Sequence, residues 1–140
     1  PPAWHAACRR QEVPPQILLI EEQERARLAY ADLLQAEGYD ALAVATPGEA
    51  LTLLNSRSFD LVLLGLPSLE SGPVEGARAL FTRAQSLRTP IVVVTSLERP
   101  FESPAPIPLS MVRTFIYRPC RPSTFLEGVR TALRSPRRAE

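Results

Sequence analysis

Residues 59–64 read FDLVLL, and this apolar run decides the fold class. A strand-length run without alternating polar residues is typical of a strand buried on both faces, as in a parallel sheet. Gly65 follows the run directly, at the carboxyl end of the expected strand. We therefore expect a central strand whose tip carries no side chain.

Outward from this run, predicted strands and helices alternate along the chain. Apolar runs predict further strands at QILLI (16–20), ALAVA (41–45), PIVVVTS (90–96) and VRTFIY (112–117). Apolar residues at helical spacing predict helices over about 24–37, 47–56, 74–85 and 122–133. Each parallel crossover needs a dozen or more residues, which these helices supply. The sequence thus predicts an α/β fold with a doubly wound, five-stranded parallel sheet. In the first helix, the residues expected on the inner side are Leu28, Tyr30, Ala31, Leu33 and Leu34.

Local signals mark the ends of several elements. Gly38 is expected just past the end of the first helix, where a left-handed backbone favours glycine. Thr46, Pro47 and Glu49 have the spacing of a capping box with proline at the first helical position. Four prolines lie between residues 96 and 111, so we expect an extended or polyproline segment, with at most one short turn, in place of a fourth crossover helix.

Length and composition indicate one domain. The chain has 140 residues. We expect a proline-rich tail or linker over 1–15, a domain over 16–134 and a basic tail over 135–140. No apolar run approaches the roughly 20 residues that span a bilayer, so we expect a cytoplasmic protein without a membrane partner.

Residue types that are rare or missing exclude several chemistries. All basic residues are arginine, which excludes a lysine Schiff base. His5 is the single histidine, so a pair of catalytic histidines cannot form. Cys8 and Cys120 cannot build a disulfide framework or a zinc site. We expect no cofactor and no enzymatic activity.

Basic charge is concentrated near the C-terminus. Residues 113–140 hold seven arginines against Glu127 and Glu140. Such a surface can hold phosphates or an acidic partner. No aromatic interleaving or nucleic-acid motif accompanies it, so we expect a solvated arginine-rich helix and no direct nucleic-acid binding.

Polar residues collect at the predicted carboxyl ends of the strands. Glu21 and Glu22 follow the first strand, Gly65 the third, Thr95 ends the fourth and Arg118 follows the fifth. In an open parallel sheet these ends meet at one edge, near the point where strand order reverses. Two acids, a hydroxyl and a cation there would suit a magnesium and phosphate pocket, but no carboxylate stands on the central strand.

This arrangement resembles the receiver domain of two-component response regulators, over about residues 16–134. The resemblance lies in the order and spacing of ILLIEEQERARL, AEGYDALAVATPGEALTLL, FDLVLLG, PIVVVTS and FIYRPCRPSTFLEGV. It implies the flavodoxin-like strand order 2-1-3-4-5. It also implies a cis peptide between Arg118 and Pro119.

The chain departs from that family at its phosphorylation site. The family places an aspartate, which accepts a phosphoryl group from a histidine kinase, at the position of Gly65, and a lysine at that of Arg118. Pro67 also stands in an altered loop. Glycine offers neither a nucleophile nor a metal ligand in its side chain. The resemblance therefore implies a degenerate pseudo-receiver.

The remaining acids allow several readings. Glu21 and Glu22 could bind Mg²⁺ weakly, with most of its waters retained. Alternatively, hydrogen bonds hold them in the loop, and Arg118 reaches across the acceptor position to pair with them, which would lock the pocket in one state. Glu70 could supply a substitute carboxylate, although an exposed position is expected for it. Thr95 is either a packed strand residue or a retained switch hydroxyl.

The resemblance also implies an interaction surface, formed by the fourth helix, fifth strand and fifth helix. We expect Cys120 to be a packing residue rather than a redox sensor. The residues expected on the partner-binding face are Arg113, Phe115, Tyr117, Arg121 and Arg130.

Together these features predict an atypical bacterial response-regulator receiver that signals by phosphorylation-independent protein–protein interaction. Its partner would be a signalling protein or its own output domain, and a homodimer is also allowed. Two alternatives stay open. One is an unconventional phosphoacceptor in a two-component phosphorelay, and the other is a pseudo-receiver that binds a small ligand in the vacated pocket.

Overall fold

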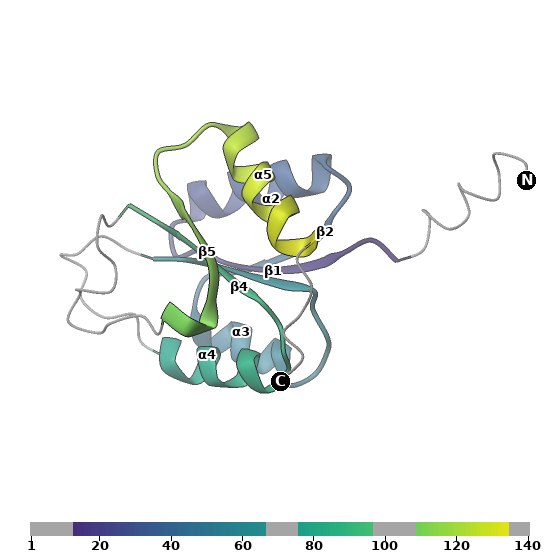
Figure 1. Cartoon of the computed structure of the whole chain (residues 1–140), viewed down its shortest axis with the longest axis vertical. Coiled ribbons are helices and arrows are strands. Elements are labelled where there is room, and N and C mark those ends of the chain that lie inside the picture. The colour runs from purple at the N-terminus through teal and green to yellow at the C-terminus, as the bar shows by residue number, and fades with distance from the viewer. Residues whose placement is uncertain (1–12, 67–75, 97–108, 135–140) are drawn as a thin grey trace, which may run out of the picture.

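The computed structural model describes residues 13–66, 76–96 and 109–134 (Figure 1). Within these residues the strands are β1 (Gln16–Ile20), β2 (Asp40–Val44), β3 (Leu61–Gly65), β4 (Ile91–Thr95) and β5 (Val112–Tyr117). The α-helices are α2 (Glu24–Ala36), α3 (Pro47–Leu54), α4 (Ala77–Ser86) and α5 (Pro122–Arg134). A short 3₁₀ turn, η3 (Leu109–Met111), precedes β5.

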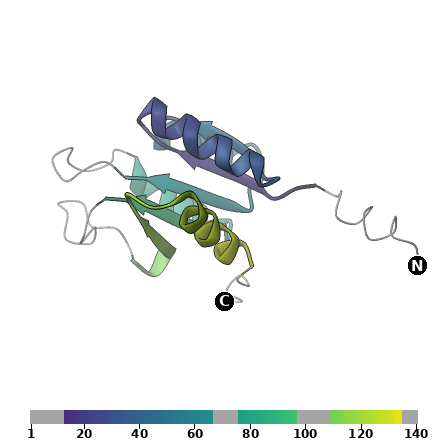
Figure 2. The same ribbon diagram turned by 90° about the horizontal axis from the view of Figure 1, so that it is seen from above.

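The strands form one parallel sheet in the order β2-β1-β3-β4-β5. The predicted fold class and strand order are therefore confirmed. Helices α2 and α5 cover one face of the sheet, and α3 and α4 cover the other (Figures 1 and 2). This doubly wound arrangement brings the carboxyl ends of β1, β3, β4 and β5 to one edge.

The sheet divides the core into two layers. Strands β3 and β4 are buried almost throughout, as their continuous apolar runs predicted. Beneath α3 and α4, the core includes Ala50, Leu80 and Phe81. Beneath α2 and α5, it includes Leu34 and Phe125. Because the central strands are buried on both faces, their tips are held rigidly.

The structure confirms the predicted local signals at the start of α3 and at the end of α2. Thr46 Oγ1 accepts a hydrogen bond from the Glu49 N–H at 3.2 Å, and the Glu49 carboxylate accepts one from the Thr46 N–H at 3.3 Å. This reciprocal pair is the predicted capping box, with Pro47 at the helix start. Gly38 has φ +98°, which is the left-handed backbone expected after α2.

One predicted inward residue of α2 is wrong. Leu28 is 57% exposed, whereas Leu34 is fully buried. Six residues separate them, which turns a helix by about 240° and leaves Leu28 away from the buried stripe. The stripe instead passes from Leu34 through Ala31 and Tyr30 to Arg27, which are all half-buried.

Other predicted bounds shift by a few residues. The helix expected over 47–56 ends at Leu54, and the one expected over 74–85 is α4, Ala77–Ser86. The proline-rich segment lies almost wholly outside the described residues, and its described end is the turn η3. Among the described residues, no helix has the length and apolar character to cross a membrane.

Candidate functional site

The carboxyl edge of the sheet brings four of the predicted site positions together. Glu21 follows β1, Gly65 ends β3, Thr95 ends β4 and Arg118 follows β5. Sheet hydrogen bonding continues into the edge, because the Arg118 N–H donates to the Thr95 carbonyl at 2.9 Å. The Thr95 side chain is fully buried. The backbone of this edge is therefore fixed by the strands themselves.

Glu21 points into the site and is almost fully buried, with 4% of its surface exposed. Its Oε1 lies 3.2 Å from Nη1 of Arg118, in an ion pair. Its Oε2 accepts a hydrogen bond from the Gln23 N–H at 3.1 Å. A buried carboxylate requires such partners, because an unpaired buried charge is costly.

Gly65 leaves the space that Glu21 uses. A Cβ atom at residue 65 would lie well inside contact distance of the Glu21 Oε1 atom, and 3.2 Å from the Ile20 carbonyl oxygen. The Glu21 carboxylate thus occupies the place where a side chain at residue 65 would begin. Position 65 and the orientation of Glu21 are coupled by this geometry.

Arg118 closes the site from the β5 side. Besides the ion pair with Glu21, its Nη2 donates to the Leu66 carbonyl at 2.6 Å. The expected pairing of Arg118 with the acids is therefore present for Glu21. The peptide bond between Arg118 and Pro119 is cis, as the resemblance implied. One guanidinium connects the ends of β1, β3 and β5.

Glu22 lies outside this arrangement. Its side chain is exposed, and its backbone carbonyl accepts from Arg27 Nη1 at 3.3 Å. The same Arg27 atom also donates to the Glu21 carbonyl at 2.9 Å. The two acids therefore differ in burial, and Glu21 is the one paired with Arg118. Among residues 13–66, 76–96 and 109–134, no group of three or more potential metal ligands gathers. Glu70 lies outside those residues.

Sequence reasoning did not assign Tyr30 and Cys120 to this site. Both lie beside Arg118, Ser96 and Pro119 around an open pocket of about 480 Å³. Burial raises the pKa of Tyr30, and the Arg118 charge acts in the opposite direction. Burial likewise raises the pKa of the Cys120 thiol, again opposed by Arg118. Sequence periodicity marked Tyr30 only as an inward helix residue, so no signal connected it with Arg118.

Comparison with known proteins adds the fold family. No family model and no curated protein matches the chain. A CheY-like receiver domain from Methanospirillum hungatei matches with a TM-score of 0.65 and 24% identity, covering 86% of this chain and 94% of that one. Response regulator TrrA from Thermotoga maritima, solved with Mg²⁺ and BeF, matches with a TM-score of 0.69 and 18% identity, covering 84% and 98%. The chain has a receiver-like fold.

A third receiver-like structure belongs to a larger protein. It is the N-terminal domain of a response regulator/sensory box/GGDEF three-domain protein from Carboxydothermus hydrogenoformans. The match has a TM-score of 0.68 at 20% identity and covers 85% of this chain and 94% of that one. The receiver-like fold of this chain therefore also occurs as one domain of a longer protein.

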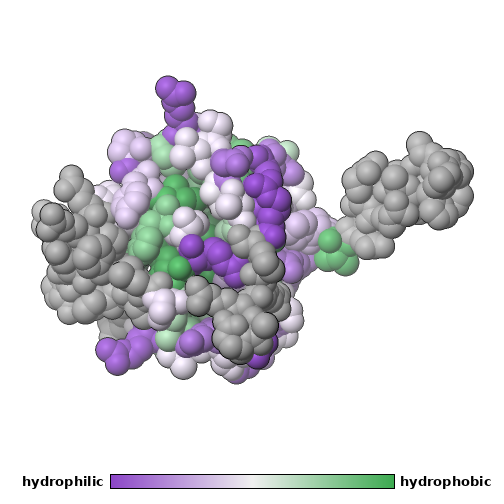
Figure 3. All heavy atoms as spheres, viewed as in Figure 1, coloured by the Kyte–Doolittle hydropathy of each residue, from purple (hydrophilic) through white to green (hydrophobic). Residues whose placement is uncertain are grey.

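On this receiver-like fold, a second concave surface lies between β5 and α5. The β5–α5 groove has a volume of about 910 Å³ and is lined by Phe115, Tyr117, Arg121, Glu127 and Gly128, among others. The Phe115 and Tyr117 rings stack with their centroids 6.1 Å apart, and Tyr117 is 49% exposed. In Figure 3, apolar atoms gather in the middle of the face that carries β5.

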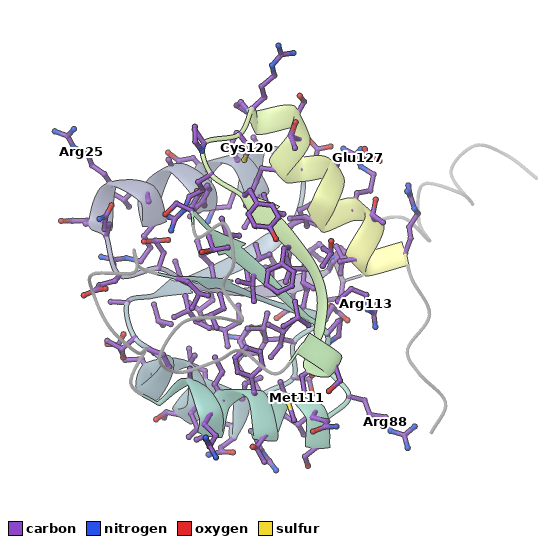
Figure 4. All side chains as sticks on the ribbon, turned by 60° about the vertical axis from the view of Figure 1, so that its left-hand side comes forward. Arg25, Arg88, Met111, Arg113, Cys120 and Glu127 are labelled. Atoms are coloured by element: carbon purple, nitrogen blue, oxygen red, sulfur yellow. The ribbon has the colours of Figure 1, made fainter. Side chains whose placement is uncertain are left out.

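The structure separates the predicted face residues into two groups. Phe115, Tyr117 and Arg121 line the β5–α5 groove. Arg113 instead donates to the Ala132 carbonyl at 2.9 Å, near the end of α5 (Figure 4). Arg130 pairs with Glu37 at 3.1 Å and with Glu127 at 2.7 Å, and is not among the groove residues. Contact with Glu37 ties Arg130 to α2.

Proposed function

We propose that this chain is a signalling module of the two-component type that binds a protein partner without being phosphorylated. The carrying observation is that the Glu21 carboxylate, paired with Arg118, occupies the space above Gly65. The resemblance implies that receivers carry their phosphoacceptor side chain at this position. Here an internal ion pair stands in its place.

The chemistry of the edge supports the absence of phosphoryl transfer. Gly65 has no nucleophile, and Glu21 is buried with its oxygens engaged by Arg118 and Gln23. Attack on a phosphoryl group needs an accessible oxygen and a cation to balance the developing charge. Glu22 is exposed, and the part of the chain that the structure describes gathers no group of three or more potential ligands for a divalent ion.

The β5–α5 groove supports the binding role. It offers a stacked aromatic pair, the half-buried Phe115 and the exposed Tyr117, next to the polar residues Arg121 and Glu127. Aromatic and arginine side chains are enriched at the centres of protein interfaces. We propose that this groove receives a signalling partner or an output domain of the same protein. From the sequence, we expect the protein to act in the bacterial cytoplasm.

A labelling experiment tests the absence of phosphorylation. The protein is incubated with acetyl phosphate and Mg²⁺ and weighed intact by mass spectrometry, beside a receiver that has the acceptor aspartate. We expect the mass of this chain to stay unchanged while the control gains one phosphoryl group. A phosphoryl adduct on this chain would favour the alternative, an unconventional phosphoacceptor, and peptide mapping would locate it.

A capture experiment tests the interaction surface. The full chain serves as bait for cell extract, and the partners retained are compared with those of Tyr117→Ala and Leu28→Ala. These residues are the exposed large apolar side chains of β5 and α2, and Leu28 lies outside the groove. We expect Tyr117→Ala to lose the partner and Leu28→Ala to keep it. Equal retention by both variants would contradict the assignment, and size-exclusion chromatography separates a homodimer from a foreign partner.

A further inference from the structure

The pocket beside Arg118 is built from three separate parts of the fold. Tyr30 comes from α2, Ser96 follows β4, and Arg118, Pro119 and Cys120 form the turn between β5 and α5. Figure 4 shows Cys120 in that turn. The pocket has a volume of about 480 Å³, which lies in the range of binding sites for small molecules, roughly 300–1,000 Å³. The pocket adjoins the β5–α5 groove that we assign to a protein partner and shares Pro119 and Cys120 with it, whereas Tyr30, Ser96 and Arg118 line only the pocket.

Arg118 is held rigidly at this pocket. Its Nη1 and Nη2 atoms bond to Glu21 and to the Leu66 carbonyl on the side of the sheet edge. A guanidinium has five N–H donors. The bonds to Glu21 and Leu66 use two of them, and a side-chain hydrogen bond with Tyr30 engages a further one. About a fifth of the side chain, 22%, remains exposed. Fixing the cation beforehand lowers the entropy cost of binding a ligand to it.

The remaining polar groups of the pocket can all donate hydrogen bonds. Because burial raises the pKa values of the Tyr30 hydroxyl and the Cys120 thiol, both keep their protons at neutral pH. Ser96 adds an exposed hydroxyl. Tyr30 is positioned by stacking on Phe125, with ring centroids 4.7 Å apart. No carboxylate is among the described residues that line the pocket.

A pocket lined by donors and a cation matches a ligand made of acceptors. We propose that the pocket formed by Tyr30, Ser96, Arg118 and Cys120 binds a small oxyanion, either a carboxylate or a phosphate. Glu21 offsets part of the Arg118 charge from the other side, so the affinity is expected to be on the order of millimolar. This inference does not depend on the proposed partner binding or on the absence of phosphorylation.

Titration with two anions tests the site. Sodium phosphate and sodium acetate are titrated separately into the ¹⁵N-labelled full chain at pH 7 and constant ionic strength, and amide shifts are followed by NMR. We expect saturable shifts at Ser96 and Cys120 with at least one anion, and the anion that saturates defines the ligand class. A lack of saturation with both would overturn the proposal.

A matched pair of tyrosine variants locates the binding. Tyr30→Phe removes the hydroxyl but keeps the ring that stacks on Phe125. Tyr39→Phe makes the same chemical change at a half-buried tyrosine outside the pocket. We expect Tyr30→Phe to raise the dissociation constant of the anion about fivefold, because the loss of one hydrogen bond costs about 1 kcal/mol. An unchanged constant in Tyr30→Phe, or an equal loss in both variants, would refute the assignment.

Discussion

Glu21 and Glu22 are neighbours in sequence but have opposite environments. Glu21 is buried against Gly65 and Arg118, whereas Glu22 is exposed. Successive side chains of an extended backbone point to opposite sides, so two adjacent acids at a strand end need not meet in one pocket. The sequence predicted an acidic pair, but the structure uses one of the two acids for the site.

Substitution of Gly65 tests the coupling between this residue and Glu21. In Gly65→Ala, the new methyl group must displace the Glu21 carboxylate from its bond with Arg118. Losing a hydrogen bond to a charged group costs about 1.5–3 kcal/mol, so we expect the free energy of unfolding in urea to fall by that amount. Gly48→Ala is the control, because the nearest atom to its new methyl, Thr46 Oγ1, is 3.9 Å away.

A double variant isolates the cause of that loss. Once Glu21→Ala has removed the carboxylate, the additional change Gly65→Ala is expected to cost much less than in the parent protein. The coupling free energy follows from urea unfolding of the two single variants and the double variant. Equal costs in both backgrounds would show that the Ile20 carbonyl, 3.2 Å from the added Cβ, sets the penalty instead.

Cys120 gives a prediction about reactivity. Because burial raises its pKa above the ordinary value of 9.0, its thiolate fraction at pH 8 is lower in the folded than in the unfolded chain. Each pKa unit lowers the thiolate fraction by about tenfold, so we expect slower alkylation of the folded protein by iodoacetamide. The rates are measured in a Cys8→Ser background, with and without urea. Faster alkylation of the native chain would contradict a packing role for Cys120.

At the scale of elements, local side-chain contacts define the helix ends. The capping box of α3 satisfies two backbone N–H groups that the helix itself leaves without partners. The inward stripe of α2 was predicted less well. Leu28 and Arg27 are neighbours in the sequence, and hydropathy favoured Leu28 for the inner position that Arg27 occupies in the structure. Arg27 lies at the inner position because its guanidinium donates hydrogen bonds to the backbone carbonyls of Glu21 and Glu22.

Removal of the α3 cap tests the element scale. We expect Thr46→Ala to lower the free energy of unfolding by about 1 kcal/mol, since the Glu49 N–H loses its acceptor. Thr52→Ala is the matched control in the same helix, where the hydroxyl donates only to the Gly48 carbonyl. Urea unfolding of the control should stay within about 0.5 kcal/mol of the parent. Equal effects of both changes would argue against a capping role.

At the scale of the whole molecule, Arg118 connects parts of the chain that lie far apart in sequence. It pairs with Glu21 at the end of β1 and bonds to Leu66 after β3, and its own backbone continues β5 toward α5. A second arginine, Arg130, connects α5 with α2 through Glu37. The two ion pairs differ in burial, since Glu21 is 5% exposed and Glu37 is 39% exposed at the side chain.

Salt dependence separates these two ion pairs. Salt screens exposed pairs strongly and buried pairs weakly. We expect Arg118→Gln to destabilise the protein by about 1.5–3 kcal/mol, with little change in about 0.5 M NaCl. Arg130→Gln should have a smaller effect that largely disappears at the same salt concentration. Thermal or urea unfolding at two salt concentrations measures both. A salt-sensitive loss in Arg118→Gln would show that its pair is effectively exposed.

The sequence by itself determined the fold class, the strand order through the resemblance, the start of α3 and the turn after α2, because these depend on hydrophobic period and short-range hydrogen bonds. Gly65 also showed directly that the central strand carries no acceptor side chain. Only the tertiary structure decided which acid fills that space, that Arg118 and Tyr30 meet at one pocket, and that Arg130 belongs with α2. Those choices depend on side-chain directions and on the packing of segments distant in sequence, which a pattern of residue types does not encode.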